Sequence, residues 1–117
     1  MGVNSDDFEN HGDRISADYN DEIAYRCTIS RKYYHIFHKL RETYPSYFDF
    51  GPGDHGKAKK LIRENVDKQL ADDLDDLHSD RKDADYDIDD NIEELDLQTF
   101  EHDLNEFILE AKSQGLF

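Results

Sequence analysis

The chain has 117 residues, of which 29 are acidic and 14 basic, so its formal net charge is −15 at pH 7. This length predicts a single domain, 1–117, with one small core and a folded part at about 5–115. No apolar run approaches the roughly 18 residues that a membrane-spanning helix needs, which argues against that class of protein.

The acidity comes mostly from aspartate, with 20 residues against 9 glutamates. Such a surplus is typical of disorder or self-repulsion, but 14 aromatic residues and periodic apolar positions favour a packed fold. In molar salt the Debye length falls to about 3 Å, so an acidic surface repels itself little. We therefore expect a salt-adapted, archaeal protein. The alternative is an acidic mesophilic protein that mimics nucleic acid or binds a basic partner.

Location and redox state are predicted from simple features. The N-terminus lacks the basic and apolar regions of a secretory signal, so we expect a soluble, cytoplasmic protein. The lone Cys27 excludes an internal disulfide, and its place in an apolar helix predicts a buried thiol.

The first half of the chain predicts two helices. Ser5 is a suitable N-cap for a short helix that runs to about Ala17, and Asn20 or Asp21 then caps a long helix that Pro45 ends. Apolar and aromatic residues lie nearly all round this long helix. We therefore expect it to be central in its bundle or shared with a partner chain.

The second half predicts three more helices with short connections. We first expect a loop at 45–56 whose aromatic side chains fold back on the bundle, followed by a short helix at 56–65. A fourth helix should run from Val66 to near Asp83, and an acidic linker follows it at 87–94. The fifth helix has an apolar stripe from Leu97 to Ala111. No strand pattern is evident. The predicted fold class is an all-α, up-and-down helical bundle of four to five helices.

The most informative segment, 29–38, places Arg31 and His38 seven residues apart. Seven residues is almost two helical turns, so both side chains project from the same side of the long helix. A guanidinium can hold phosphate oxygens, and an imidazole can move a proton near neutral pH. The pair therefore suits work on a phosphodiester, and a polar seam inside a dimer interface is the structural alternative.

The segment Ser30-Arg31-Lys32-Tyr33-Tyr34-His35-Ile36-Phe37-His38 resembles the Ser-Arg-x-Tyr-Tyr-x-x-Phe-His helix of the HEPN domain family. Three further pieces follow that family's order: 26–29, which leads into the helix, Asp54-His55-Gly56, which is similar to its histidine–glycine helix start, and 77–86, which is similar to its Leu-x3-Arg-x2-Ala-Asp-Tyr stretch. The resemblance covers about 5–115.

This resemblance implies a bundle that forms a homodimer, often coded beside a minimal nucleotidyltransferase as a toxin–antitoxin pair. Active HEPN proteins are metal-independent endoribonucleases whose Arg-x4–6-His motif carries catalysis, and the motif maps here onto Arg31 and His38. In the dimer the two long helices would pool these side chains in one cleft, with RNA as substrate. Other members are non-catalytic, so the alternative function is a binding module that docks a nucleotidyltransferase or another partner.

Further residues are candidates for binding RNA or supporting the pair. Tyr34 lies one turn from both members and can orient the imidazole or stack on a base. The resemblance implies that Arg81 braces the central helix through an ion pair. Basic residues at 57–63 form a positive patch, which is equally the pattern of a solvated helix face. The full set is Tyr33, Tyr34, His35, His55, Lys57, Lys60, Arg63 and Arg81.

Two weak metal patterns are present. Residues 83–94 place acids as in a calcium-binding EF-hand loop, but Ile88 occupies the position where glycine makes the turn. His35, His38 and Glu42 are spaced to share a metal but have no evident fourth ligand. We predict no metal and no cofactor.

Overall fold

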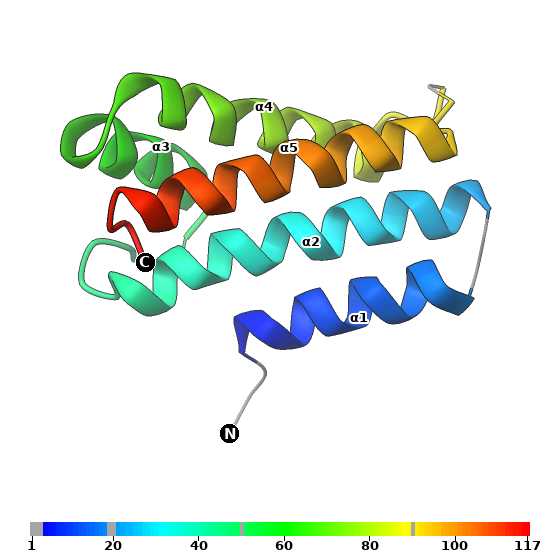
Figure 1. The fold of residues 1–117 in the computed structure, drawn as a ribbon, viewed down its shortest axis with the longest axis horizontal. Coiled ribbons are helices and arrows are strands. Elements are labelled where there is room, and N and C mark those ends of the chain that lie inside the picture. Colours follow the sequence, from blue (N-terminus) through cyan, green and yellow to red (C-terminus); the bar gives the residue numbers. More distant parts are fainter. Residues whose placement is uncertain (1–3, 19–20, 50, 90) are drawn as a thin grey trace.

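The computed structural model describes all residues except 1–3, 19, 20, 50 and 90, and no strand occurs in that part. Its elements are α1 (Ser5–Asp18), α2 (Glu22–Thr43), α3 (Asp54–Asn65), α4 (Lys68–Tyr86) and α5 (Glu94–Ser113), and consecutive long helices run in opposite directions (Figure 1). The predicted all-α bundle is confirmed. Among the described residues, no helix has the length and apolar character needed to cross a bilayer.

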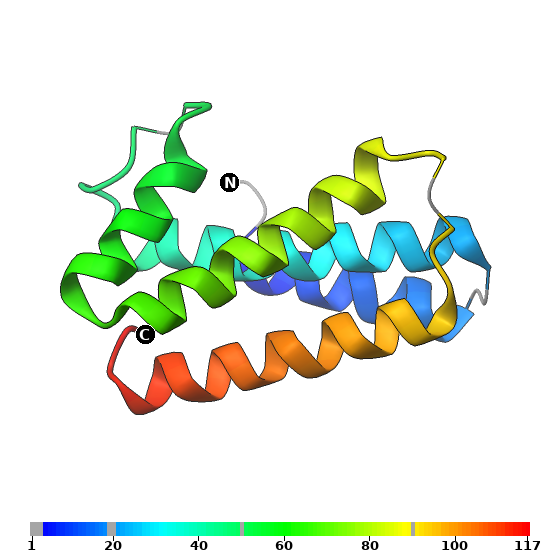
Figure 2. The ribbon, with the colours of Figure 1, turned by 90° about the horizontal axis from the view of Figure 1, so that it is seen from above.

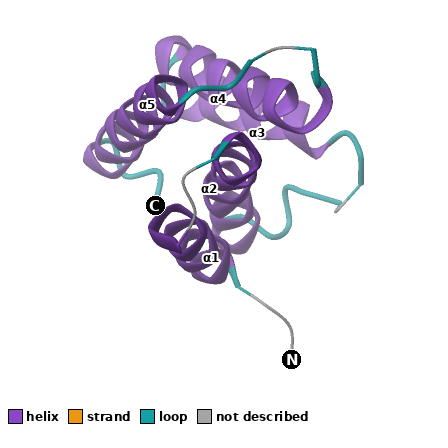
Figure 3. Ribbon diagram, turned by 90° about the vertical axis from the view of Figure 1, so that its right-hand side faces the viewer, coloured by secondary structure: helices purple, strands orange, loops and turns teal. Residues whose placement is uncertain are grey.

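Helix α2 occupies the centre of the bundle. It contacts each of the other four helices, whereas α1 contacts α2 alone among the described helices. Figure 2 shows α4 crossing over α2 at an oblique angle, and Figure 3 shows α1 at the edge of the bundle beside α2. The predicted central position of the long helix is therefore confirmed, and α1 is a peripheral helix.

Local side-chain caps explain most helix boundaries. Asp21 caps α2 and Asp67 caps α4, each through a carboxylate that accepts a backbone N–H three residues on, at 2.9 and 2.6 Å. Because Asp67 supplies this cap, Val66 ends α3 and does not begin the fourth helix as predicted. The structure also begins α3 at Asp54, two residues earlier than expected, and extends α4 to Tyr86.

The core is apolar and centred on α2. The largest fully buried apolar side chains are Tyr33, Ile36, Phe37, Leu40, Ile62, Leu70, Leu74, Leu77, Phe100 and Phe107. Phe48 of the loop after α2 folds back and is buried, as predicted, whereas Phe50 lies outside the described residues. The prediction for Cys27 is wrong: its side chain is exposed, because it lies on a side of α2 that its neighbours leave partly open.

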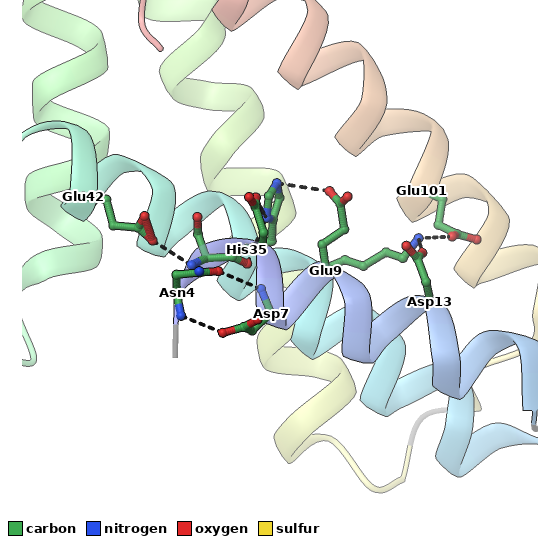
Figure 4. A network of polar contacts seen from close by, with 10 residues as sticks. Asn4, Asp7, Glu9, Asp13, His35, Glu42 and Glu101 are labelled. Atoms are coloured by element: carbon green, nitrogen blue, oxygen red, sulfur yellow. Dashed lines mark hydrogen bonds and ion pairs between the residues drawn. The ribbon is translucent and has the colours of Figure 1, made fainter. Parts of the chain in front are cut away.

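Polar contacts hold α1 along one side of α2 (Figure 4). The buried Ser5 donates its backbone N–H to the Glu42 carboxylate at 2.6 Å, and its carbonyl oxygen lies 3.0 Å from Nδ1 of His35. The other ring nitrogen of His35 lies 3.1 Å from Glu9. Lys32 completes the attachment by bridging Asp13 of α1 and Glu101 of α5, at 2.9 and 2.7 Å.

Candidate active site

One side of α2 carries a row of accessible functional groups. Cys27, Arg31, Tyr34 and His38 occupy successive turns of an unbroken helix, so Arg31 and His38 lie on the same side. Cys27 is exposed and the other three are partly exposed, in contrast to the buried Ile29 and neighbouring core positions. This row, not the core side, is therefore where α2 can meet a ligand.

Arg31 forms part of the wall of a surface cavity of about 530 Å³ between α1 and α2. The cavity is lined by Asp7, Phe8, Asn10, His11, Arg14 and Arg31. Within the described residues neither Arg31 nor Arg14 has an ion pair or a hydrogen bond. Two guanidinium groups without carboxylate partners make this cavity suited to an anion such as a phosphate.

His38 is half-buried and keeps its ring nitrogens free. Its ring packs against Phe8 at 4.8 Å and against Tyr34 at 5.6 Å between centroids, and in the described chain no hydrogen bond engages either nitrogen. Burial, followed by the positive charge of Arg41, lowers the pKa of His38 below its usual value. The imidazole is therefore neutral at pH 7, which is the state that a general base requires.

Phe8 of α1 contacts His38 and shares a cavity wall with Arg31. Its ring lines the cavity that contains Arg31 and packs on the ring of His38, which is not part of that cavity wall. Sequence reasoning had no means of finding this contact, since Phe8 belongs to a different helix. In one chain Arg31 and His38 thus share a face of α2, and Phe8 contacts the His38 ring while it lines the cavity that Arg31 borders.

Tyr34 is held in place from the side opposite α1. The guanidinium of Arg81 donates a short hydrogen bond to its hydroxyl and lies 4.9 Å from its ring centroid. Nε of Arg81 also lies 2.9 Å from Asp85, although at an angle that makes no hydrogen bond, and Asp85 accepts a bond from Ser30 of α2. Arg81 therefore does contact the central helix, but through a tyrosine hydroxyl and not through a direct ion pair.

A second cluster joins α2, α3 and α4. The ring of His55 stacks between Phe37 at 4.0 Å and His78 at 4.2 Å, and the Tyr33 hydroxyl lies 2.8 Å from its Nδ1. Burial, together with the nearby positive groups, lowers the pKa of His55 to about 4. Sequence reasoning missed His78, although its position four residues after the buried Leu74 places it on the inner side of α4.

Several predicted RNA contacts are engaged inside the fold. Tyr33 is buried, and burial raises the pKa of its hydroxyl, while His35 is buried against α1. On α3, Lys57 pairs with Asp49 at 2.8 Å and Lys60 lies 3.9 Å from Glu64. The lysines of the basic patch therefore lie beside carboxylates, whereas Arg63 is exposed with no ion pair among the described residues. The structure does not bring the patch into the cavity with Arg31.

The described residues contain no group of three or more histidine, cysteine, aspartate or glutamate side chains that could hold a metal. The EF-hand pattern begins inside a helix, because residues 83–86 still belong to α4, and Asp90 lies outside the described residues.

Comparison of the chain with models of protein families, with curated proteins and with solved structures finds no match. Membership of the HEPN family, dimer formation and RNA as substrate therefore stay predictions from the sequence.

Proposed function

We propose that this protein is a metal-independent endoribonuclease of the HEPN type, in which Arg31 binds the scissile phosphate and His38 transfers protons. The proposal depends on the lack of polar partners of these two side chains among the described residues and on the neutral form of the His38 imidazole. In a chain of net charge −15, Arg31 has no ion pair with the described residues and borders an open cavity, and His38 is neutral with unengaged nitrogens.

The proposed reaction is an internal transesterification. Neutral His38 removes the proton from a ribose 2′-hydroxyl, and the resulting oxygen attacks the adjacent phosphorus. The bond from phosphorus to the 5′-oxygen breaks, and that oxygen receives a proton from an imidazolium. The products are a 2′,3′-cyclic phosphate and a free 5′-hydroxyl, because the nucleophile is the 2′-oxygen and not water. Arg31 offsets the charge that builds on the phosphoryl oxygens.

This scheme requires two imidazoles in different protonation states. One His38 cannot act as base and acid in the same step, and a homodimer would supply a second copy from the same side of the second α2. The acidic surface adds a further condition, because long-range repulsion of RNA is screened only as salt rises. We therefore propose that the enzyme works at high ionic strength and depends on local contacts such as Arg31.

The test is RNA cleavage by the purified protein in KCl with EDTA present. We expect the parent to generate cyclic phosphate ends and His38→Ala to be at least about 100-fold slower, as for loss of a general acid–base group. His102→Ala is the matched control, because His102 is exposed on α5 and does not belong to the row of functional groups on α2. Cleavage that persists in His38→Ala, or that EDTA abolishes, contradicts the proposal.

A second candidate function is a non-catalytic docking module, and one surface favours it. Ile23, Tyr86, Ile88 and Leu95 are large apolar side chains that are all exposed. They lie where α2 begins, α4 ends and α5 begins, which is the right-hand end of the bundle in Figure 1. If neither parent nor variant cleaves RNA, this function is preferred, and Leu95→Glu should then weaken binding to a nucleotidyltransferase coded by a neighbouring gene.

A further inference from the structure

The walls of the cavity between α1 and α2 suit a nucleotide. Arg14 and Arg31 supply two guanidinium groups, Phe8 supplies an aromatic ring, and Asn10 and His11 supply polar side chains. We propose that this cavity binds the nucleotide of an RNA strand that carries the scissile phosphate, with that phosphate on the two arginines and the base against Phe8. The proposal rests on the proposed function for the identity of the polymer, but it does not depend on His38.

Arg14 and Arg31 differ from several other cations of the chain in having no ion pair with a described carboxylate. Lys32 bridges two carboxylates, Lys59 lies 2.9 Å from Asp75, and Arg41 forms a 2.8 Å ion pair with Asp54. Arg63 and Lys68 also lack a carboxylate partner among the described residues, but Arg14 and Arg31, which likewise have none, line the cavity. A phosphate is the ligand that a guanidinium fork matches, through two parallel hydrogen bonds.

Phe8 offers the second recognition element. One side of its ring packs on His38, with 33° between the planes, and the ring also forms part of the cavity wall. An aromatic face of this kind accepts any base, because every base has a π-face. The cavity volume of about 530 Å³ falls within the range of roughly 300–1,000 Å³ that is usual for small-molecule sites.

The attachment of α1 leaves this wall free for a ligand. His35 and Lys32 of α2 hold α1 through contacts with Glu9 and Asp13, and Figure 4 shows these contacts. The helices approach closely at Gly12, where an added Cβ would lie only 3.2 Å from the Lys32 side chain. Among the described residues, the polar contacts that position α1 therefore do not involve His11 or Arg14, and Phe8 contacts α2 through its ring.

Substitution of Asp7 should change the binding affinity in the direction opposite to substitution of the arginines. Its carboxylate lines the same cavity and accepts the backbone N–H of Asn4 at 2.9 Å. A bound phosphate would experience its repulsion, whereas an amide at this position keeps the acceptor and removes the charge. Asp7→Asn should therefore tighten binding, by about threefold, while arginine substitutions weaken it.

The experiment measures binding of a labelled 2′-O-methyl oligoribonucleotide, which cannot form a cyclic phosphate, by fluorescence anisotropy at one fixed KCl concentration. We expect Arg14→Ala to weaken binding about tenfold, as for loss of one charge-assisted contact. Phe8→Leu, which keeps an apolar cover on His38, should weaken it by a similar factor. Lys68→Ala removes one positive charge from the exposed first turn of α4 and is the matched control, with a change below about twofold.

His38→Ala separates this proposal from the proposed function. Binding that survives His38→Ala and depends on Arg14 supports the nucleotide site even if the parent cleaves no RNA. Equal effects of Arg14→Ala and Lys68→Ala, with thermal unfolding unchanged, overturn it. Adenosine monophosphate that binds as tightly as the oligonucleotide would also overturn it, since the cavity would then select a free nucleotide and not an RNA strand.

Discussion

Acid should destabilise the junction of α2, α3 and α4, because it forces a charge onto His55. The ring is stacked between Phe37 and His78, and its Nδ1 accepts the Tyr33 hydroxyl bond only while that nitrogen is unprotonated. Burial is the main cause that lowers the pKa of His55 to about 4. The charged groups around it are His78 and Arg81 of α4 and Arg41 of α2, which lower it further, and Asp54 of α3, which raises it.

The direction of the effect follows from proton uptake. His55 titrates near 6.5 when unfolded and near 4 when folded, so the unfolded chain binds more protons between these values. Stability is therefore complete above pH 6.5 and falls as the pH drops towards 4. Between pH 7 and pH 5 the full shift corresponds to about 2 kcal/mol, and the partial exposure of the ring reduces the expected loss to about 1 kcal/mol.

Urea unfolding of the parent and of His55→Gln at pH 7 and at pH 5 measures this loss. Glutamine does not titrate and can still accept the Tyr33 hydroxyl bond, and carboxylate titrations elsewhere are common to both proteins and cancel. We expect the parent to lose about 1 kcal/mol more than the variant. The reasoning is refuted if both proteins lose the same free energy, or if the variant loses more. His102→Gln, at an exposed site, should behave like the parent.

Three further predictions address the packing around α2. Arg41→Met leaves the fully buried Asp54 carboxylate without its ion pair and should lower the free energy of unfolding by about 3–5 kcal/mol in urea at pH 7; a loss below 1 kcal/mol would contradict this. Tyr34→Phe removes the hydroxyl that accepts the Arg81 hydrogen bond and should lower the free energy of unfolding by about 1–2 kcal/mol in the same assay. An unchanged free energy of unfolding would show that this hydrogen bond does not stabilise the fold. Cys27 is exposed, so a thiol reagent should label the native protein nearly as fast as the urea-unfolded chain; strong protection would show that this face is covered.

Much of the secondary structure could be predicted because its causes are local. The Asp21 cap is a bond between a side chain and a backbone group three residues away, and Pro45 excludes a longer α2 by its own geometry. The boundary between α3 and α4 was misplaced by two residues, since Val66 continues the apolar pattern although Asp67 caps a new helix. The apolar residues around α2 likewise predicted its central place in the bundle.

The sequence by itself determined which residues share a face of one helix: Arg31 with His38, and Leu74 with His78. Only the tertiary structure decided what lies over each face. It set Phe8 against His38, stacked His78 on His55, left Cys27 exposed, and opened a cavity beside two arginines. The reason is that helical periodicity depends on neighbours within a few residues, whereas the pairing of faces depends on how all five helices bury their apolar surfaces together.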